Sequence, residues 1–166
     1  MKLAVIYDSV TGNTKKAAEW IVDGMKKAGA EACAFSIDDV DGDFVSEAKG
    51  AVIGSPSYSA SMTPKMREWL MKAGKLGMAG KLGGAFSTVQ YTHGGGELVI
   101  QSILTIEMCF GMLCYSGGSS KGKPVIHLGP VAVNGNVEEH NCLDNYKENF
   151  IIYGERFAQK ALEIFS

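Results

Sequence analysis

Residues 2–14 of the chain read KLAVIYDSVTGNT. The run Lys2–Tyr7 has the length and the apolar content of a buried strand, and it stops at Asp8. A loop rich in hydroxyl groups follows, and beyond it Ala17, Ile21 and Met25 recur at helical spacing. A buried strand that leads through a polar loop into an amphipathic helix is the opening unit of a parallel α/β sheet.

The same alternation of short apolar runs and amphipathic stretches continues to the end of the chain. It predicts further strands at 31–37, 51–53 and 81–88, and an interrupted last strand at 112–116 and 125–128. Helices are predicted before Gly29, near 44–48, after the Thr63-Pro64 cap, at 97–110, and along a C-terminal stripe from Phe150 to Phe165. The fold class is therefore α/β, a three-layer doubly wound parallel sheet of five strands, with residues 1–166 as one domain.

Composition excludes several classes of protein. The 166 residues carry 16 Lys and Arg against 18 Asp and Glu, and 46% are hydrophobic, so the chain is not intrinsically disordered. No basic run exceeds a Lys pair, which argues against nucleic acid as a partner. The four cysteines have neither C-x-x-C nor zinc-ligand spacing, so we expect no metal and no structural disulfide. The first apolar run is too short for a signal peptide or a membrane span, and we expect a cytoplasmic protein.

Three loops at the carboxyl ends of predicted strands have unusual compositions: DSVTGNT at 8–14, SPSYSASMTP at 55–64 and STVQYTHGGG at 87–96. In doubly wound sheets, ligands bind outside these strand ends, where the strand order reverses. The glycine excess, 21 of 166 residues, gains meaning here, because Gly12 and Gly94–Gly96 fall within these loops. One histidine, His93, lies in the third loop, and the two others, His127 and His140, lie outside the loops.

The first loop has the chemistry of an anion site. A helix N-terminus offers unpaired N–H groups and a positive dipole end, and neighbouring hydroxyls add neutral donors. The loop lacks the glycines and the lysine of a P-loop, the G-x-G-x-x-G of a dinucleotide fold, and the Cys and Arg of a small phosphatase. A phosphomonoester held by neutral donors remains, unless Thr11 or Asn13 only caps the helix.

These loops resemble those of the flavodoxin-like FMN-binding family. The stretches SVTGNT, GSPSYSASMTPKMREWL and FSTVQYTHGGGE are similar to its three FMN loops. They resemble in particular the NAD(P)H:quinone oxidoreductase branch, with its patterns T-P-T-x-x-x-x-M-T-P-K-M and S-T-x-x-x-G-G-G. The resemblance implies a sheet of order 2-1-3-4-5 that holds one non-covalent FMN.

Carried onto this chain, the resemblance assigns each loop a part of the cofactor. The phosphate would be bound by Ser9, Val10 through its backbone, Thr11, Gly12, Asn13 and Thr14. The flavin edge would lie along Pro56, Ser57, Tyr58, Ser59 and Ala60. The ribityl chain and the pyrimidine end of the ring would be held by Ser87, Thr88, Val89, Gln90, Tyr91, Gly94, Gly95 and Gly96.

Three of the loop residues carry open alternatives. Tyr58 and Tyr91 either stack on the flavin ring or are ordinary half-buried loop aromatics. His93 either donates to the flavin or a quinone, or is an inert surface residue. Ala60 stands where the quinone-reductase branch often has a glycine, whose free backbone would let the peptide turn toward flavin N5.

These assignments lead to a preferred function and two rivals. The first is an FMN-dependent oxidoreductase that passes hydride from NAD(P)H through flavin N5 to a quinone-like acceptor. The second is a flavodoxin, an electron carrier that binds redox partner proteins, although a net charge of −2 is weak for a steered carrier. The third, a flavin domain of a larger enzyme, is disfavoured by the complete last helix. The very apolar 97–110 segment should be buried on more than one side, either under the sheet or against another subunit.

Overall fold

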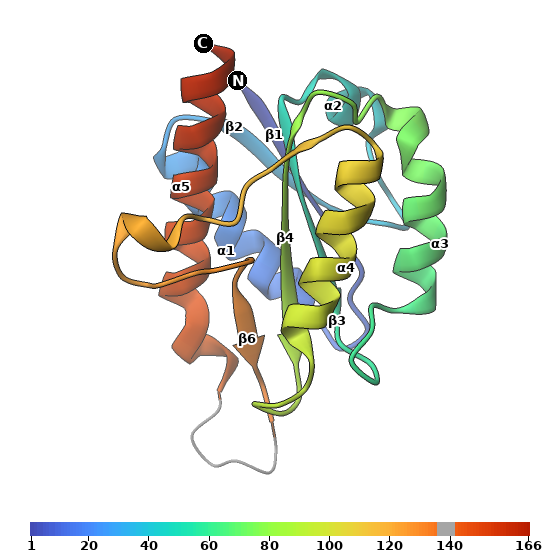
Figure 1. Cartoon of the computed structure of the whole chain (residues 1–166), viewed down its shortest axis with the longest axis vertical. Helices are drawn as coiled ribbons and strands as arrows, with labels where there is room; N and C mark the ends of the chain where they lie inside the picture. Colours follow the sequence, from blue (N-terminus) through green and yellow to red (C-terminus); the bar gives the residue numbers. More distant parts are fainter. Residues whose placement is uncertain (136–141) are drawn as a thin grey trace.

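The computed structural model describes residues 1–135 and 142–166, and within them the strands form one parallel sheet (Figure 1). Its order is β2-β1-β3-β4-β5, with β6 also paired to β4, which confirms the predicted 2-1-3-4-5 arrangement. The strands are β1 (Lys2–Tyr7), β2 (Glu31–Ser36), β3 (Gly50–Pro56), β4 (Leu82–Val89), β5 (Leu113–Cys114) and β6 (Val131–Val133). The α-helices are α1 (Asn13–Lys27), α2 (Gly42–Glu47), α3 (Pro64–Ala73), α4 (Gly96–Cys109) and α5 (Lys147–Phe165).

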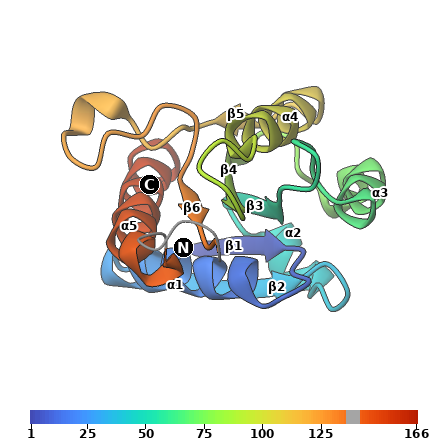
Figure 2. The ribbon, with the colours of Figure 1, turned by 90° about the horizontal axis from the view of Figure 1, so that it is seen from below.

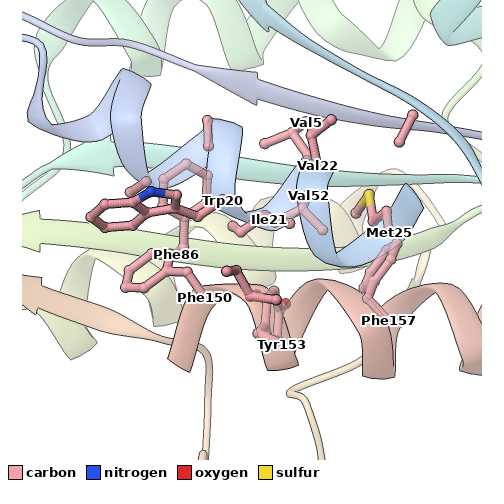
Figure 3. Close-up of a cluster of buried hydrophobic side chains, with 14 of the residues drawn as sticks. Val5, Trp20, Ile21, Val22, Met25, Val52, Phe86, Phe150, Tyr153 and Phe157 are labelled. Carbon is pink, nitrogen blue, oxygen red and sulfur yellow. The ribbon is translucent and has the colours of Figure 1, made fainter. Parts of the chain in front are cut away.

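Helices cover both faces of the sheet, as the three-layer prediction requires (Figure 2). On one face, side chains of α1 and α5 gather with Phe86 of β4 into an aromatic core (Figure 3). The Phe150 ring meets those of Trp20 and Phe86 edge-on at centroid distances of 6.2 and 6.0 Å. On the other face, α2, α3 and α4 cover the sheet through a second buried cluster.

Glycine sets the distance between α1 and α5. A Cβ on Gly24 would lie 1.9 Å from the carbonyl oxygen of Ile151, and one on Gly154 would lie 2.1 Å from that of Ile21. The two helices therefore touch backbone to backbone, and any side chain at either glycine would force them apart. Gly24 is thus a packing residue.

The prediction of a strand at residues 125–128 is wrong. Residues 125–128 form no strand, and the ladder on β4 resumes only at β6. The preceding loop leaves the sheet because the buried guanidinium of Arg156 gathers its carbonyl groups on the side of α5. The acceptors are the backbone oxygens of Gly117, Lys121, Gly122, Lys123 and Pro124. Carbonyl groups held by a side chain in this way are not available to a strand ladder.

The burial predicted for helix 97–110 is also only half correct. Val99, Ile100 and Ile103 of α4 are fully buried against the sheet. Leu98 and Met108 are 56% and 57% exposed, so the outer face of α4 carries apolar side chains into solvent.

A tyrosine hydroxyl bridges the gap between β5 and β6. The ladder on the edge of β4 runs from β5 as far as the bond from Tyr115 N–H to Gly83 O, and it resumes where Ser87 N–H donates to Pro130 O. Between them, the buried Tyr153 hydroxyl donates to Tyr115 O at 3.3 Å. Gly84 leaves the space, since a Cβ there would lie 2.4 Å from this hydroxyl oxygen.

Replacing this tyrosine tests the bridge. Tyr153→Phe leaves the Tyr115 carbonyl group without this donor, and we expect it to lower the free energy of unfolding by about 1–3 kcal/mol. Tyr115→Phe is the matched control, because the buried Tyr115 hydroxyl has no hydrogen-bond partner in the described chain. Its removal should change the stability by less than about 1 kcal/mol. Urea denaturation of both variants makes the comparison, and equal losses would contradict the bridge.

Glu107 of α4 is a carboxyl group buried beneath the same strand edge. Its side chain is fully buried, and a Cβ on Gly83 would lie 2.6 Å from its Oε2. Oε1 has no hydrogen-bond partner within the described residues, while the Cys114 thiol donates weakly to Oε2 over 3.8 Å. Burial without a cation raises the pKa of Glu107 well above its usual value.

This burial predicts a pH dependence of stability. Because the pKa of Glu107 is raised in the folded state, the unfolded chain ionises first, and stability falls as the pH rises above the ordinary carboxyl pKa. Glu107→Gln should remove that loss, so the free energy of unfolding of the variant should rise relative to that of the wild type between about pH 5 and pH 8. Glu68→Gln is the control, since Lys72 lowers the pKa of exposed Glu68. Chemical denaturation across this range gives the result, and parallel pH profiles of wild type and Glu107→Gln would refute it.

Candidate cofactor site

The loop between β1 and α1 presents backbone donors at the carboxyl edge of the sheet. Gly12 is the N-cap of α1 with φ 93°, a left-handed conformation that glycine adopts without strain. Ser9 Oγ accepts the N–H of Lys15, so the serine caps the first turn. In the described chain, no protein acceptor takes the N–H groups of residues 10–14. The first turn also lacks an acidic residue, so the loop is suited to an anion.

Two side-chain contacts tie this loop to neighbouring strand ends. The Thr14 and Thr88 hydroxyls hydrogen-bond at 2.8 Å in a buried position, which links α1 to the end of β4. The Asn134 amide, just beyond β6, donates to Asn13 Oδ1 at 3.1 Å. Asn134 was absent from the sequence-based site because the last strand was expected at 125–128. Its only sequence signal is an Asn-Gly pair after an apolar run.

The loop after β3 is a tight and strained hairpin. Tyr58 and Ser61 exchange backbone hydrogen bonds of 2.9 and 3.0 Å around Ser59 and Ala60. Both central residues have positive φ, 51° and 59°, as a type I′ turn requires, although neither is glycine. Left-handed backbone costs an L-residue about 1–2 kcal/mol, so the protein holds this turn against local preference.

The loop after β4 packs against that hairpin. The Ser57 hydroxyl donates to Gly94 O at 2.6 Å. Gly95, which has φ 76° and caps α4, faces Ala60 so closely that a Cβ on the glycine would lie 2.4 Å from Ala60 Cβ. Gly96 has a packing reason of its own, since a Cβ there would collide with Val131. The two loops therefore form one continuous rim.

A buried network behind the rim joins β1, β3 and α3. The Thr63 hydroxyl donates to Asp8 Oδ2 at 2.5 Å and accepts the Met66 N–H, which confirms Thr63 as the N-cap of α3. The Thr63 N–H donates to Ser55 Oγ at 3.1 Å. Asp8 and Ser55 were not among the predicted site residues, because their role is to join loops that are distant in sequence.

The structure thus brings all three predicted loops to one edge of the sheet. Val10, Tyr58 and Tyr91 are 67%, 49% and 49% exposed at the rim, and His93 is also exposed. Stacking by either tyrosine and a role for His93 stay predictions. His127 lines a cavity of about 390 Å³ whose lining includes none of the predicted site residues. His140 lies outside the described residues.

Comparison with known proteins gives this geometry a family. The sequence model of the flavodoxin family matches residues 5–96, which include all three loops. The chain belongs to the flavodoxin family. It is 39% identical to a flavodoxin of Clostridium saccharobutylicum, over 99% of this chain and 100% of that one. A flavodoxin of Aquifex aeolicus is 36% identical over 78% of this chain and 73% of its own.

Similarity to enzymes of the family is weaker. An NAD(P)H dehydrogenase (quinone) of Archaeoglobus fulgidus is 26% identical over 68% of this chain and 74% of its own. Among solved structures, a flavodoxin from the domain Archaea superposes with a TM-score of 0.76 at 24% identity, covering 98% of this chain and 99% of that one. This superposition confirms the flavodoxin-like fold. No helix in the described residues is long and apolar enough to cross a membrane.

Proteins of this family bind FMN, which confirms the cofactor expected from the sequence. The loop donors fit that group, because residues 10–14 offer free N–H groups to a phosphate while the rim stays open for a flat ring. The loop from Ser9 to Thr14 contains no basic side chain, so the phosphate donors there are neutral.

Replacing Ala60 by glycine should relieve the backbone strain in the hairpin at residues 58–61. Ala60→Gly should raise the free energy of unfolding by roughly 0.5–1 kcal/mol, because the left-handed cost removed exceeds the entropy that glycine adds to the unfolded chain. Ala79→Gly, at an exposed alanine without positive φ, is the control and should destabilise. Thermal or urea unfolding of the apoprotein compares them. A loss of stability in Ala60→Gly would show that the turn is not strained.

Proposed function

We propose that this protein is a flavodoxin in function, an FMN-dependent electron carrier that exchanges electrons with redox partner proteins. The observation that carries the proposal is the full-length match to a flavodoxin at 39% identity, over 99% of this chain. The NAD(P)H dehydrogenases (quinone) match at 25–29% identity, over 67–80% of this chain. The sequence-based preference for a quinone-reducing enzyme therefore becomes the second candidate.

In this proposal the chain binds the phosphate with neutral donors. The N–H groups of residues 10–14, together with the hydroxyls of Ser9, Thr11 and Thr14, surround the anion at the positive end of α1. The buried Thr14–Thr88 bond fixes the first turn of α1 relative to β4. Because the loop itself contains no charged donor, the affinity depends on the geometry of the backbone donors.

The two remaining loops hold the ring. Residues 56–60 form one side of the rim, and residues 87–91 with 94–96 form the other, joined by the Ser57–Gly94 bond. The half-exposed rings of Tyr58 and Tyr91 are positioned to contact a planar cofactor from the rim. FMN bound there would supply the redox chemistry, and the exposed residues of the rim would be accessible to a partner protein.

Added negative charge at Thr11 tests the phosphate assignment. Thr11 is exposed, so Thr11→Glu should not disturb the fold. The new carboxylate would lie beside the phosphate and should weaken FMN binding at least about tenfold. Ser120→Glu, exposed on the loop after β5, adds the same charge elsewhere and should leave the affinity unchanged. Titration of flavin fluorescence gives both constants. Unchanged affinity in Thr11→Glu would remove the phosphate from this loop.

Turnover with small substrates separates the two functions. The FMN-loaded protein is mixed with NADH or NADPH and a benzoquinone, and nicotinamide absorbance is followed. A carrier should oxidise essentially none until a separate reductase is added. Rapid oxidation by the protein alone would support the second candidate, the NAD(P)H:quinone oxidoreductase, for which the similarity to the Archaeoglobus fulgidus enzyme is the favouring observation.

A further inference from the structure

Two buried hydroxyl groups meet behind the loop between β1 and α1. Thr14 lies in the first turn of α1 and Thr88 lies near the end of β4, and the two residues are only 1% and 4% exposed. Their Oγ1 atoms are 2.8 Å apart, and either hydroxyl can be the donor. The direction of this hydrogen bond is therefore decided by what surrounds the pair.

The pair holds two protons, and the bond between the hydroxyls uses one of them. Each threonine hydroxyl carries one proton and accepts hydrogen bonds through its oxygen. In the described part of the chain, neither hydroxyl has a hydrogen bond other than the one that joins them. One buried hydroxyl proton thus has no acceptor among these residues, although buried donors normally have one.

An anion in the loop would supply that acceptor and would also fix the direction of the bond. Thr14 belongs to residues 10–14, whose backbone N–H groups have no acceptor in the described chain. A phosphate at this helix terminus accepts hydrogen bonds, so the Thr14 hydroxyl would donate to it. The Thr14 oxygen would then have to accept from Thr88.

We propose that Thr88 is a positioning residue for phosphate recognition, which acts through the hydroxyl of Thr14. The inference rests on the proposed function, because it requires the phosphate of FMN at residues 10–14. A threonine side chain in a helix occupies more than one χ1 rotamer. The bond from Thr88 selects the rotamer in which Thr14 Oγ1 faces β4 and leaves the Thr14 proton to the anion. A hydrogen bond accepted by a hydroxyl also strengthens the one that it donates.

This role differs from the one that the family resemblance implies, a direct contact of Thr88 with the ribityl chain. Riboflavin has the ribityl chain and the ring of FMN but no phosphate, so a direct contact would serve both ligands. A role through Thr14 would serve FMN alone. The backbone of Thr88 contributes equally in both cases, because its carbonyl group accepts the Ser57 N–H at 2.9 Å whatever the side chain is.

Thr88→Val and Thr88→Ser distinguish the two roles. Valine has the shape of threonine without the hydroxyl, while serine keeps the hydroxyl. We expect Thr88→Val to weaken FMN binding about five- to tenfold and to change riboflavin binding by less than about twofold. Thr88→Ser should keep the selectivity of the wild type for FMN. Calorimetric titration of each apoprotein with the two ligands gives the constants, and circular dichroism verifies that the variants are folded.

Thr14→Val and the double variant T14V/T88V test whether Thr88 acts through Thr14. Thr14→Val removes a donor to a charged group and should weaken FMN binding at least about tenfold. When Thr88 acts only through Thr14, its substitution has no further effect once the Thr14 hydroxyl is gone. The double variant should therefore bind FMN with the affinity of Thr14→Val.

Three results would overturn the inference while the proposed function stands. They are equal losses of FMN and riboflavin affinity in Thr88→Val, an unchanged FMN affinity in that variant, and losses that add in T14V/T88V. Each of them leaves the phosphate assignment intact when the wild type binds FMN more tightly than riboflavin. A wild type that binds both ligands equally, or that does not bind FMN, would overturn the phosphate assignment and this inference with it.

Discussion

The function that we propose for this protein depends on a row of backbone N–H groups that have no acceptor within the described residues. They belong to residues 10–14, at the point where β1 passes into α1. Gly12 makes the row possible, because its left-handed backbone turns the chain into the helix without a side chain above the donors. An anion would accept hydrogen bonds from these N–H groups. The phosphate of FMN, the cofactor that this family binds, is such an anion.

The rest of the site is built to keep that row in place. Thr14 is bonded to Thr88, and Asn13 receives a bond from Asn134, so the first turn of α1 is attached to the ends of both β4 and β6. Asp8 and Thr63 join the same loop to α3. At the outer edge of the sheet, the Tyr153 hydroxyl donates to Tyr115 O where the chain leaves β5.

Much of this could be predicted from the sequence, since periodicity and loop composition are local signals. The parallel α/β class, the cap at Thr63 and the convergence of three loops follow from them, whereas the order of the sheet was implied by the resemblance to the flavodoxin-like family. The second half of the last strand could not be predicted, because the preceding loop is drawn away by Arg156, which lies more than 30 residues later in the chain. Asn134 and Asp8 were missed for the same reason, as their partners are distant in sequence. The exposure of Leu98 and Met108 likewise depends on which side of α4 the sheet occupies.

Comparison of FMN with riboflavin tests the central claim most directly, since the two ligands differ only in the phosphate. In calorimetric titrations of the apoprotein, the account predicts that one FMN binds per chain and that riboflavin binds at least about a hundredfold more weakly, because it leaves the N–H groups of residues 10–14 unsatisfied. Equal affinities for the two ligands, or no binding of FMN, would contradict it.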